Sequence, residues 1–286
     1  MPESAATKRS LVIRGLDRVG GVWLNTVVPF FSVRLALIGG VYFLMQDVAR
    51  WIWRSIVDPK VRFGRNALAT QIIRVGAKAT LIVMLVCGCV GLILALQMEP
   101  VLSEFGQTGM IAFIVGVSIT RELGPLIAAI VMTGFAGAAI AAELGTMVVG
   151  EEIEALEAHA LNPVRFLVVP RICATTLGLI LLTVIADVTA IIAGGAMSVL
   201  FLDVPYEVYR ANTFAGIDLT DFLTGLLKAS VFGVILSTLA CYHGLAVTGG
   251  AAGVGRATTA TVVQAVVAVI IADLAFTAIF YSIGWG

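Results

Sequence analysis

Long apolar stretches separated by short polar segments are the feature that most constrains the fold of this chain. Residues 79–98 carry no charged side chain, and about 20 apolar residues in a helix are enough to cross the hydrocarbon core of a membrane. Backbone polar groups cannot stay unpaired in lipid, so such stretches must be helical. With 59% hydrophobic and 13% charged residues and a mean hydropathy of +1.03, the 286-residue chain is predicted to be an all-α membrane protein.

The basic residues are unevenly distributed. Twelve of the eighteen Lys and Arg residues lie between Lys8 and Lys78, although the formal net charge is zero. The positive-inside rule therefore predicts a cytoplasmic N-terminus, and a neutral chain gives no reason to expect a nucleic-acid partner. We divide the chain into a cytoplasmic or interfacial N-terminal region, residues 1–78, and a transmembrane domain, residues 79–286.

The apolar pattern predicts five crossings, at about residues 79–98, 123–147, 166–202, 221–245 and 259–283. With the N-terminus inside, residues 148–165 and 246–258 fall in the cytoplasm and the C-terminus falls outside. The polar residues 203–220 are expected to form an external loop, and the Gly-rich residues 248–255 a turn.

The stretch from residue 105 to residue 142 is too long for one crossing, because a single helix of that length would extend about 57 Å. Two crossings would need a turn, which Gly124-Pro125 could form, but Arg121 and Glu122 would then lie at the membrane boundary with almost no loop. We therefore expect a shallow or re-entrant segment over residues 105–120.

Residues 10–60 allow two interpretations. Their apolar runs, residues 22–31 and 35–45, are short and are divided by Arg34. Trp23, Trp51 and Trp53 among arginines are typical of an amphipathic helix at the headgroup level. A sixth crossing over residues 20–46 is the alternative.

Motifs for nucleotide or metal chemistry are missing from the sequence. The Gly-rich residues 249–255 follow a predicted crossing and lack the lysine of a phosphate-binding loop, so we expect no cofactor on this chain. His159 and His243 have no carboxylates at ligand spacing. The cysteines all lie in apolar stretches, where a thiol behaves as a small hydrophobic group. We predict neither a metal site nor catalysis.

An acidic segment, residues 150–163, interrupts the apolar pattern. Its apolar residues, Ile153, Leu156, Ala160 and Leu161, recur at helical spacing among four glutamates, and the helix should end before Pro163. A short amphipathic helix between two crossings can dock into a groove on a partner protein. The alternative is a solvated acidic loop.

Several motifs resemble the MlaE/YrbE family of permeases. They are Arg121-Glu122-Leu123-Gly124-Pro125, Ala141-Ala142-Glu143-Leu144-Gly145-Thr146-Met147, the acidic segment, Asn162-Pro163-Val164-Arg165, Val169-Pro170-Arg171 and Gly253-Val254-Gly255-Arg256-Ala257-Thr258-Thr259. The resemblance covers roughly residues 60–284, with the motifs in the family's order.

The resemblance implies the permease subunit of an ABC transporter in the inner membrane, which moves phospholipids or other hydrophobic molecules together with an MCE-domain protein. It implies a homodimer, with ATP and Mg²⁺ bound by two partner ATPase subunits. The acidic segment would then be the coupling helix, where the family typically has Asp in place of Glu154. The residues expected to couple to the ATPase are Glu151, Glu152, Glu154, Leu156, Glu157 and Leu161.

Ionisable side chains at membrane depth are costly unless paired or hydrated, so each is a functional candidate. The resemblance places Arg121 and Glu122 near the lipid path, where an arginine can hold a phosphate in a bidentate manner. The alternative is a structural ion pair that anchors the re-entrant segment, in which Arg121 could meet an acid three or four residues away or on another helix. We expect apolar side chains such as Leu94, Met98 and Val101 to line the lipid cavity at the dimer interface.

Four other charges could make polar contacts within the membrane. We expect Glu143 to pair near Arg165 or Arg171, and Lys228 to extend to the membrane surface or to pair with Asp221. Asp187 and Asp273 could bond to serines, to threonines or to each other.

Small-residue runs such as Gly194-Gly195-Ala196 are expected to be packing surfaces.

Two rival functions remain at the level of sequence. A proton-coupled secondary transporter would use Asp187 and Asp273 as proton carriers. An intramembrane enzyme acting on lipids would need a nucleophile and a base, and no such pair occurs at a useful spacing.

Overall fold

The computed structural model describes residues 28–57 and 65–284, and every regular element in those two ranges is helical. The chain divides into two compact units, residues 1–46 and 47–286, and each is described by itself. In the first unit, residues 28–46 form the beginning of helix α2. The described ranges confirm the all-α membrane class.

Five helices are long and several short ones lie between them. The long helices are α2 (Val28–Val57), α3 (Arg65–Glu104), α8 (Val169–Phe201), α10 (Leu219–Leu245) and α11 (Gly250–Ile283). The short helices are α4 (Ile111–Ser118), α5 (Gly124–Met132), α6 (Ala138–Val149), α7 (Glu152–Ala158) and α9 (Tyr206–Gly216). A 3-10 turn, η3 (Thr108–Met110), and three π-helical turns, η4 (Ile119–Leu123), η5 (Thr133–Gly137) and η6 (Val164–Val168), adjoin them.

Six helical stretches of the described chain have the length and composition of a membrane span. They are residues Leu35–Ser55, Ala79–Glu104, Thr108–Val149, Val164–Phe201, Leu219–Leu245 and Gly250–Ile283. The chain is therefore a multi-pass membrane protein. The stretch at residues 35–55 lies within α2, a single helix that contains Arg34. Both interpretations of this region predict a helix over residues 35–45, and Trp23 lies outside the described residues.

The prediction of a re-entrant segment at residues 105–120 is wrong. After a turn at residues 105–107, the backbone stays in the right-handed helical region from η3 through α6, 42 residues in all. Pro125 does not break this helix, because it follows the π-helical turn η4, where the Gly124 N–H bonds to the Ile119 carbonyl across five residues. A wider turn of this kind accommodates a residue that lacks an N–H.

Two predicted connections also differ from the structure. Residues 203–220 are not simply a loop, since they contain α9, which packs against α4 and donates a hydrogen bond from Asn212 Nδ2 to the Gly109 carbonyl at 2.7 Å. The Gly-rich turn after α10 is shorter than predicted. Gly249 adopts a left-handed conformation with φ of 85°, and α11 begins directly after it.

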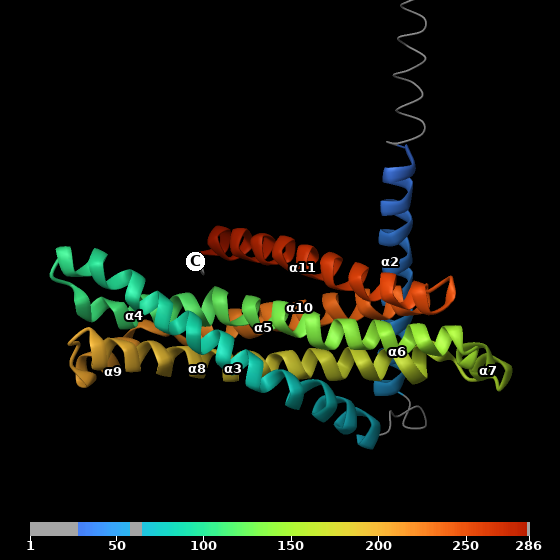
Figure 1. Cartoon of the computed structure of the whole chain (residues 1–286), viewed down its shortest axis with the longest axis horizontal. Helices are drawn as coiled ribbons and strands as arrows, with labels where there is room; N and C mark the ends of the chain where they lie inside the picture. Colours follow the sequence, from blue (N-terminus) through green and yellow to red (C-terminus); the bar gives the residue numbers. More distant parts are fainter. Residues whose placement is uncertain (1–27, 58–64, 285–286) are drawn as a thin grey trace, which may run out of the picture. The chain divides into compact units, whose positions relative to one another are not determined.

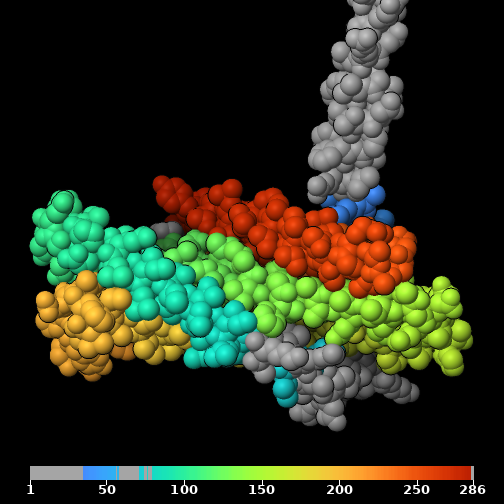
Figure 2. Space-filling view, viewed as in Figure 1, coloured from blue at the N-terminus to red at the C-terminus, as the bar shows by residue number. Residues whose placement is uncertain are grey.

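The helices of the second unit run roughly side by side (Figure 1). Helix α3 packs along α8, α8 packs against α10, and α10 also contacts α6 and α11. The most apolar window of α10 is 56% buried, whereas that of α11 is 11% buried. In Figure 2, α11 forms the upper surface of the unit in red and orange. The core therefore lies around α8 and α10, and α11 leaves most of its apolar surface to another partner or to lipid.

Candidate functional site

Helix α7 lies at one end of the second unit, and α9 and the start of α4 lie at the other (Figure 1). Helix α7 follows α6 through Gly150 and Glu151. Glu151 has a left-handed backbone with φ of 57°. Its side chains at Glu151, Glu152, Glu154 and Glu157 are all exposed. The acidic segment is thus a true helix, which ends well before Pro163, as predicted.

The C-terminal end of α7 is closed by a Schellman motif. The Leu161 N–H bonds to the Leu156 carbonyl at 3.0 Å, and the Ala160 N–H bonds to the Glu157 carbonyl at 2.9 Å. Ala160 provides the left-handed residue that this motif requires, with φ of 57°. The motif turns Leu161 back beside Leu156.

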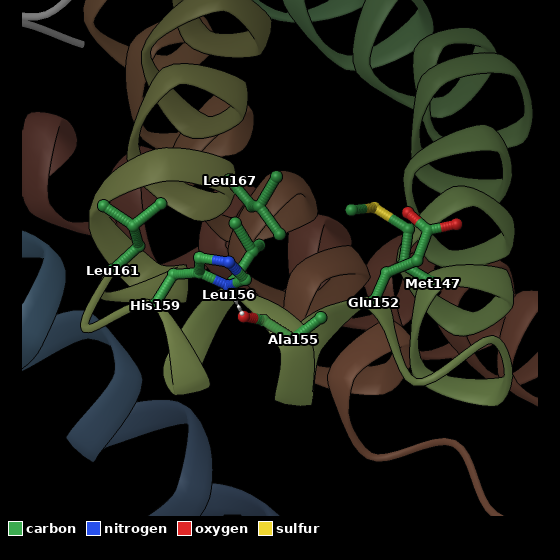
Figure 3. A pocket seen from close by; sticks show the side chains of 7 residues that line it. All are labelled: Met147, Glu152, Ala155, Leu156, His159, Leu161 and Leu167. Atoms are coloured by element: carbon green, nitrogen blue, oxygen red, sulfur yellow. Dashed lines mark hydrogen bonds between the residues drawn. The ribbon is translucent and has the colours of Figure 1, made fainter.

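An apolar pocket of about 350 Å³ lies beneath α7. In Figure 3, Met147 and Glu152 lie on one side of it, and Leu156, Leu161 and Leu167 lie on the other. His159 and Ala155 complete the lining, and His159 Nδ1 lies 2.7 Å from the Ala155 carbonyl oxygen. This end of the unit thus combines a short amphipathic helix, an apolar pocket lined in part by Glu152, and three further exposed glutamates.

Ala160, the left-handed residue of the Schellman motif, provides a direct test of the α7 geometry. An alanine in the left-handed region costs about 1–2 kcal/mol relative to the right-handed one, a penalty that glycine does not carry. Ala160→Gly should therefore raise the melting temperature of the purified protein slightly. Ala158→Gly, inside α7, should lower the melting temperature, because glycine has a helix propensity about 1 kcal/mol less favourable than that of alanine. Equal effects of the two changes would contradict the motif.

The helices next to α7 are fixed by two cationic contacts. Arg171 Nη2 lies 3.4 Å from Glu143 Oε2 and its Nη1 donates to the Leu167 carbonyl at 3.1 Å, which joins α8 to α6. Of the two partners predicted for Glu143, the structure thus selects Arg171. Arg165 instead places its guanidinium 5.5 Å from the ring centre of Trp51 in the last part of α2.

A second set of functional candidates lies inside the bundle. Lys228 of α10 is 1% exposed, and its Nζ contacts the Glu122 carboxylate of η4. The same Nζ lies 2.9 Å from Asp273 Oδ1 of α11, an ion pair without hydrogen-bond alignment, and donates to Thr277 Oγ1 at 3.0 Å. One ammonium group thus joins η4, α10 and α11.

The prediction for Lys228 was therefore wrong in both forms, since it neither reaches the membrane surface nor pairs with Asp221. Asp221 lies 3.5 Å from Arg121 Nη1, which confirms an acid on another helix as the partner of Arg121. Asp221 and Lys228 are seven residues apart and occupy one face of α10. Arg121 and Glu122 are neighbours in sequence, so they reach toward opposite ends of that face.

Close backbone contacts bring the π-helical turn η4 against its neighbours. A Cβ at Gly225 of α10 would lie 2.1 Å from the Thr120 carbonyl oxygen, and a Cβ at Gly124 would lie 1.7 Å from Asp187 Oδ1 of α8. The Thr120 oxygen belongs to the backbone, so position 225 accepts only glycine unless η4 shifts, whereas at position 124 the Asp187 side chain would have to move. Turns of this kind are frequent at functional sites, and here the turn carries the Arg121-Glu122 pair.

Asp187 and Asp273 are not joined in the described part of the chain. Asp187 is 3% exposed and its Oδ1 has no hydrogen-bond partner, whereas Asp273 pairs with Lys228. A threonine does contact Asp273, but through the backbone: Thr277 Oγ1 lies 2.9 Å from the Asp273 carbonyl oxygen and 3.0 Å from Glu122 Oε1.

The predicted lipid-path residues of α3 lie apart from this cluster in the sequence. Leu94 and Met98 are half-buried and Val101 is exposed, on the last turns of α3.

Sequence reasoning missed Thr277 and the role of Trp51 as a partner of Arg165. The spacing of Asp221 and Lys228 on α10 could have indicated that these residues pair with Arg121 and Glu122. Opposite charges seven residues apart on one helix match an adjacent Arg-Glu pair on a neighbouring helix.

The family model of permease MlaE matches residues 68–279. This chain belongs to the MlaE permease family. Among curated proteins, it is 33% identical to a probable ABC transporter permease protein of Rickettsia prowazekii (strain Madrid E), over 88% of this chain and 95% of that protein. It is 34% identical to a probable ABC transporter permease protein of Synechocystis sp. (strain ATCC 27184 / PCC 6803 / Kazusa), over 74% of this chain and 81% of that protein.

A plant protein is also similar. The chloroplastic protein of Arabidopsis thaliana named TRIGALACTOSYLDIACYLGLYCEROL 1 is 30% identical over 82% of this chain and 70% of its own length. The chain is therefore a member of a permease family with bacterial and plastid relatives.

Proposed function

We propose that this chain is the non-catalytic permease subunit of an ABC transporter that moves phospholipid, or another hydrophobic molecule, between the inner membrane and an MCE-domain partner protein. ATP and Mg²⁺ would be bound by a separate ATPase subunit. Family membership supports the permease role, and the relative named after a galactolipid supports a lipid substrate. The observation that carries the proposal is α7, an exposed acidic helix over an apolar pocket.

Helix α7 has the properties of a coupling element. Its carboxylates are free to contact a basic partner surface, and the pocket beneath it can accept an apolar side chain. Because α7 lies directly between α6 and η6–α8 in the chain, a push on it acts on two membrane helices at once. Movement of an ATPase subunit would reach the lipid cavity by this route.

The lipid path is proposed to lie at a homodimer interface. The exposed apolar face of α11 and the partly exposed residues Leu94, Met98 and Val101 of α3 are available for it. Arg121 and Glu122 keep 25% and 35% of their side chains exposed. Arg121 could therefore offer a hydrogen-bond donor to a lipid phosphate while it stays paired with Asp221.

The orientation follows from α7. If α7 faces an ATPase it lies in the cytoplasm, as does the Lys- and Arg-rich N-terminal region, in agreement with the positive-inside rule. We retain residues 79–286 as the permease domain and residues 1–78 as the cytoplasmic or interfacial region.

Charge reversal on α7 tests the coupling role. The variant Glu151→Lys, Glu152→Lys, Glu154→Lys should insert into the membrane normally, because all three side chains are exposed. It should lose most of its ATPase subunit during affinity purification of the complex, since like charges now face each other. The measurement is the ratio of ATPase to permease in the purified complex.

The matched control reverses exposed acids at the opposite end of the unit. Glu104→Lys with Asp203→Lys changes the net charge in the same direction but lies away from α7. This variant should retain the ATPase subunit. Normal ATPase retention by the α7 variant, or equal loss in the control, would remove the support for coupling through α7.

A further inference from the structure

A second apolar pocket, of about 550 Å³, lies between α8 and α9, at the end of the unit opposite α7. Its walls include Ile191, Ile192, Val199 and Leu200 from the last three turns of α8. These residues fall within the candidate membrane span that ends at Phe201. That stretch is long and apolar enough to cross a membrane, and the pocket volume is in the range of ligand sites.

Glycines of α8 allow α9 to cover this pocket. Tyr209 of α9 is 6% exposed and donates from its hydroxyl to the Ile191 carbonyl at 3.0 Å. A Cβ at Gly195 would lie 2.7 Å from Tyr209 Cε1, so the ring needs the glycine. The next small residue, Ala196, leaves the hollow beside the ring unfilled. The run predicted to be a packing surface thus receives a side chain of α9 as well.

The rim of the pocket is polar and charged. Tyr206 and Arg210, on the first turns of α9, line it directly. Within the described part of the chain, Arg210 forms an ion pair with Glu207 through Nε at 3.9 Å. This contact leaves the donors of the two terminal guanidinium nitrogens available. A guanidinium with free terminal donors can hold a phosphate through charge-assisted hydrogen bonds.

An apolar chamber with a guanidinium and a phenol in its lining matches an amphiphile with a phosphate. We propose that the α8–α9 pocket binds one acyl chain of a glycerophospholipid whose phosphate pairs with Arg210. Glu207, beside Arg210, would face the ammonium group of a zwitterionic headgroup such as phosphatidylethanolamine. A water-soluble anion could bind Arg210 but would make no contact with the apolar walls of the pocket.

This lipid site is distinct from the proposed transport path. The pocket is built from α8 and α9, whereas the path is proposed along α3, Arg121 and α11. A lipid held here would stabilise α9 against α8 and would remain bound while substrate moves. The inference does not depend on the identity of the transported molecule.

Native mass spectrometry of the purified, delipidated complex can test the site, with phosphatidylethanolamine and diacylglycerol of the same chains as probes. Ala196→Trp fills the chamber and should remove one tightly bound lipid per chain with either probe. Arg210→Gln should weaken phosphatidylethanolamine binding about tenfold or more, because it removes a charge-assisted hydrogen bond. It should leave diacylglycerol binding unchanged.

The control for the added bulk is Leu181→Trp. Leu181 is an exposed residue of α8 outside the pocket, so this variant should bind lipid like the unmodified protein. An unchanged lipid count in Ala196→Trp would overturn the proposal, as would equal effects of Arg210→Gln on both probes. If the variant Ala196→Cys crosslinked to a partner subunit rather than to a photoreactive lipid, a protein helix would be the occupant and the proposal would fail. ATPase retention in the same samples reports separately on the coupling role of α7.

Discussion

Replacing Lys228 with methionine should destabilise the protein by about 3–5 kcal/mol, the cost of removing one partner from a buried ion pair. Lys228 is 1% exposed and its ammonium group contacts Glu122, Asp273 and Thr277 on two neighbouring helices. Without it, two carboxylates remain close together at membrane depth with no cation between them. The loss should also loosen α11, because its buried surface is small.

The measurement is thermal unfolding in mild detergent, followed with a thiol-reactive dye. Cys87 and Cys241 are free and buried, so they react only when the helices separate. Combining Lys228→Met with Glu122→Gln and Asp273→Asn should recover much of the lost stability, because the triple variant leaves no unpaired charge in the cluster. If Lys228→Met melted like the unmodified protein, the ammonium group would not hold these helices together.

Gly91→Ala should separate α3 from α8 and destabilise the protein by about 1–3 kcal/mol or more. A Cβ at this position would lie 2.0 Å from the Ala190 carbonyl oxygen and 2.8 Å from the Ala190 carbonyl carbon. These are backbone atoms of α8, so they cannot move aside as a side chain would. The nearby Gly194 has the same role from the other helix, because its Cβ would lie 3.1 Å from the Gly91 carbonyl oxygen.

Gly76→Ala is the matched control, since it lies in the same helix and its Cβ would meet no atom within 4 Å. It should be neutral, or more stable by up to about 1 kcal/mol from helix propensity. Both variants can be compared by the same thermal measurement and by the yield of intact complex. Equal stability of the two would show that α3 and α8 are not in backbone contact at Gly91.

Apolar periodicity predicted the crossings well where a charge or a proline marked their ends. The spans at residues 166–202 and 221–245 agree with η6–α8 and α10 to within a few residues. The errors are at residues 105–120, where the length of the apolar stretch indicated a shallow or re-entrant segment, and at residues 248–255, where repeated glycines indicated a turn. Residues 108–149 remain helical, because a π-helical turn accommodates Pro125. The turn before α11 is short, and Gly249 and Gly250 adopt positive φ values of 85° and 65° there.

The pairing of charges inside the bundle could not be predicted in the same way. Each partner choice depends on the rotation and axial position of one helix relative to another, which local sequence does not encode. Lys228 was expected to reach the membrane surface or to pair with Asp221. The bundle instead places Asp221 against Arg121, and Lys228 against Glu122 and Asp273.

The sequence by itself determined the all-α membrane class and the acidic helix α7, and its motifs resembled the permease family that the comparisons then established. Each of these depends on local composition, spacing or motif order. Only the tertiary structure decided that Glu143 pairs with Arg171, that α7 covers an apolar pocket, and that α9 covers another on α8. Those features arise where glycines allow backbones to approach or where a buried charge needs a partner, and both conditions depend on how the helices pack.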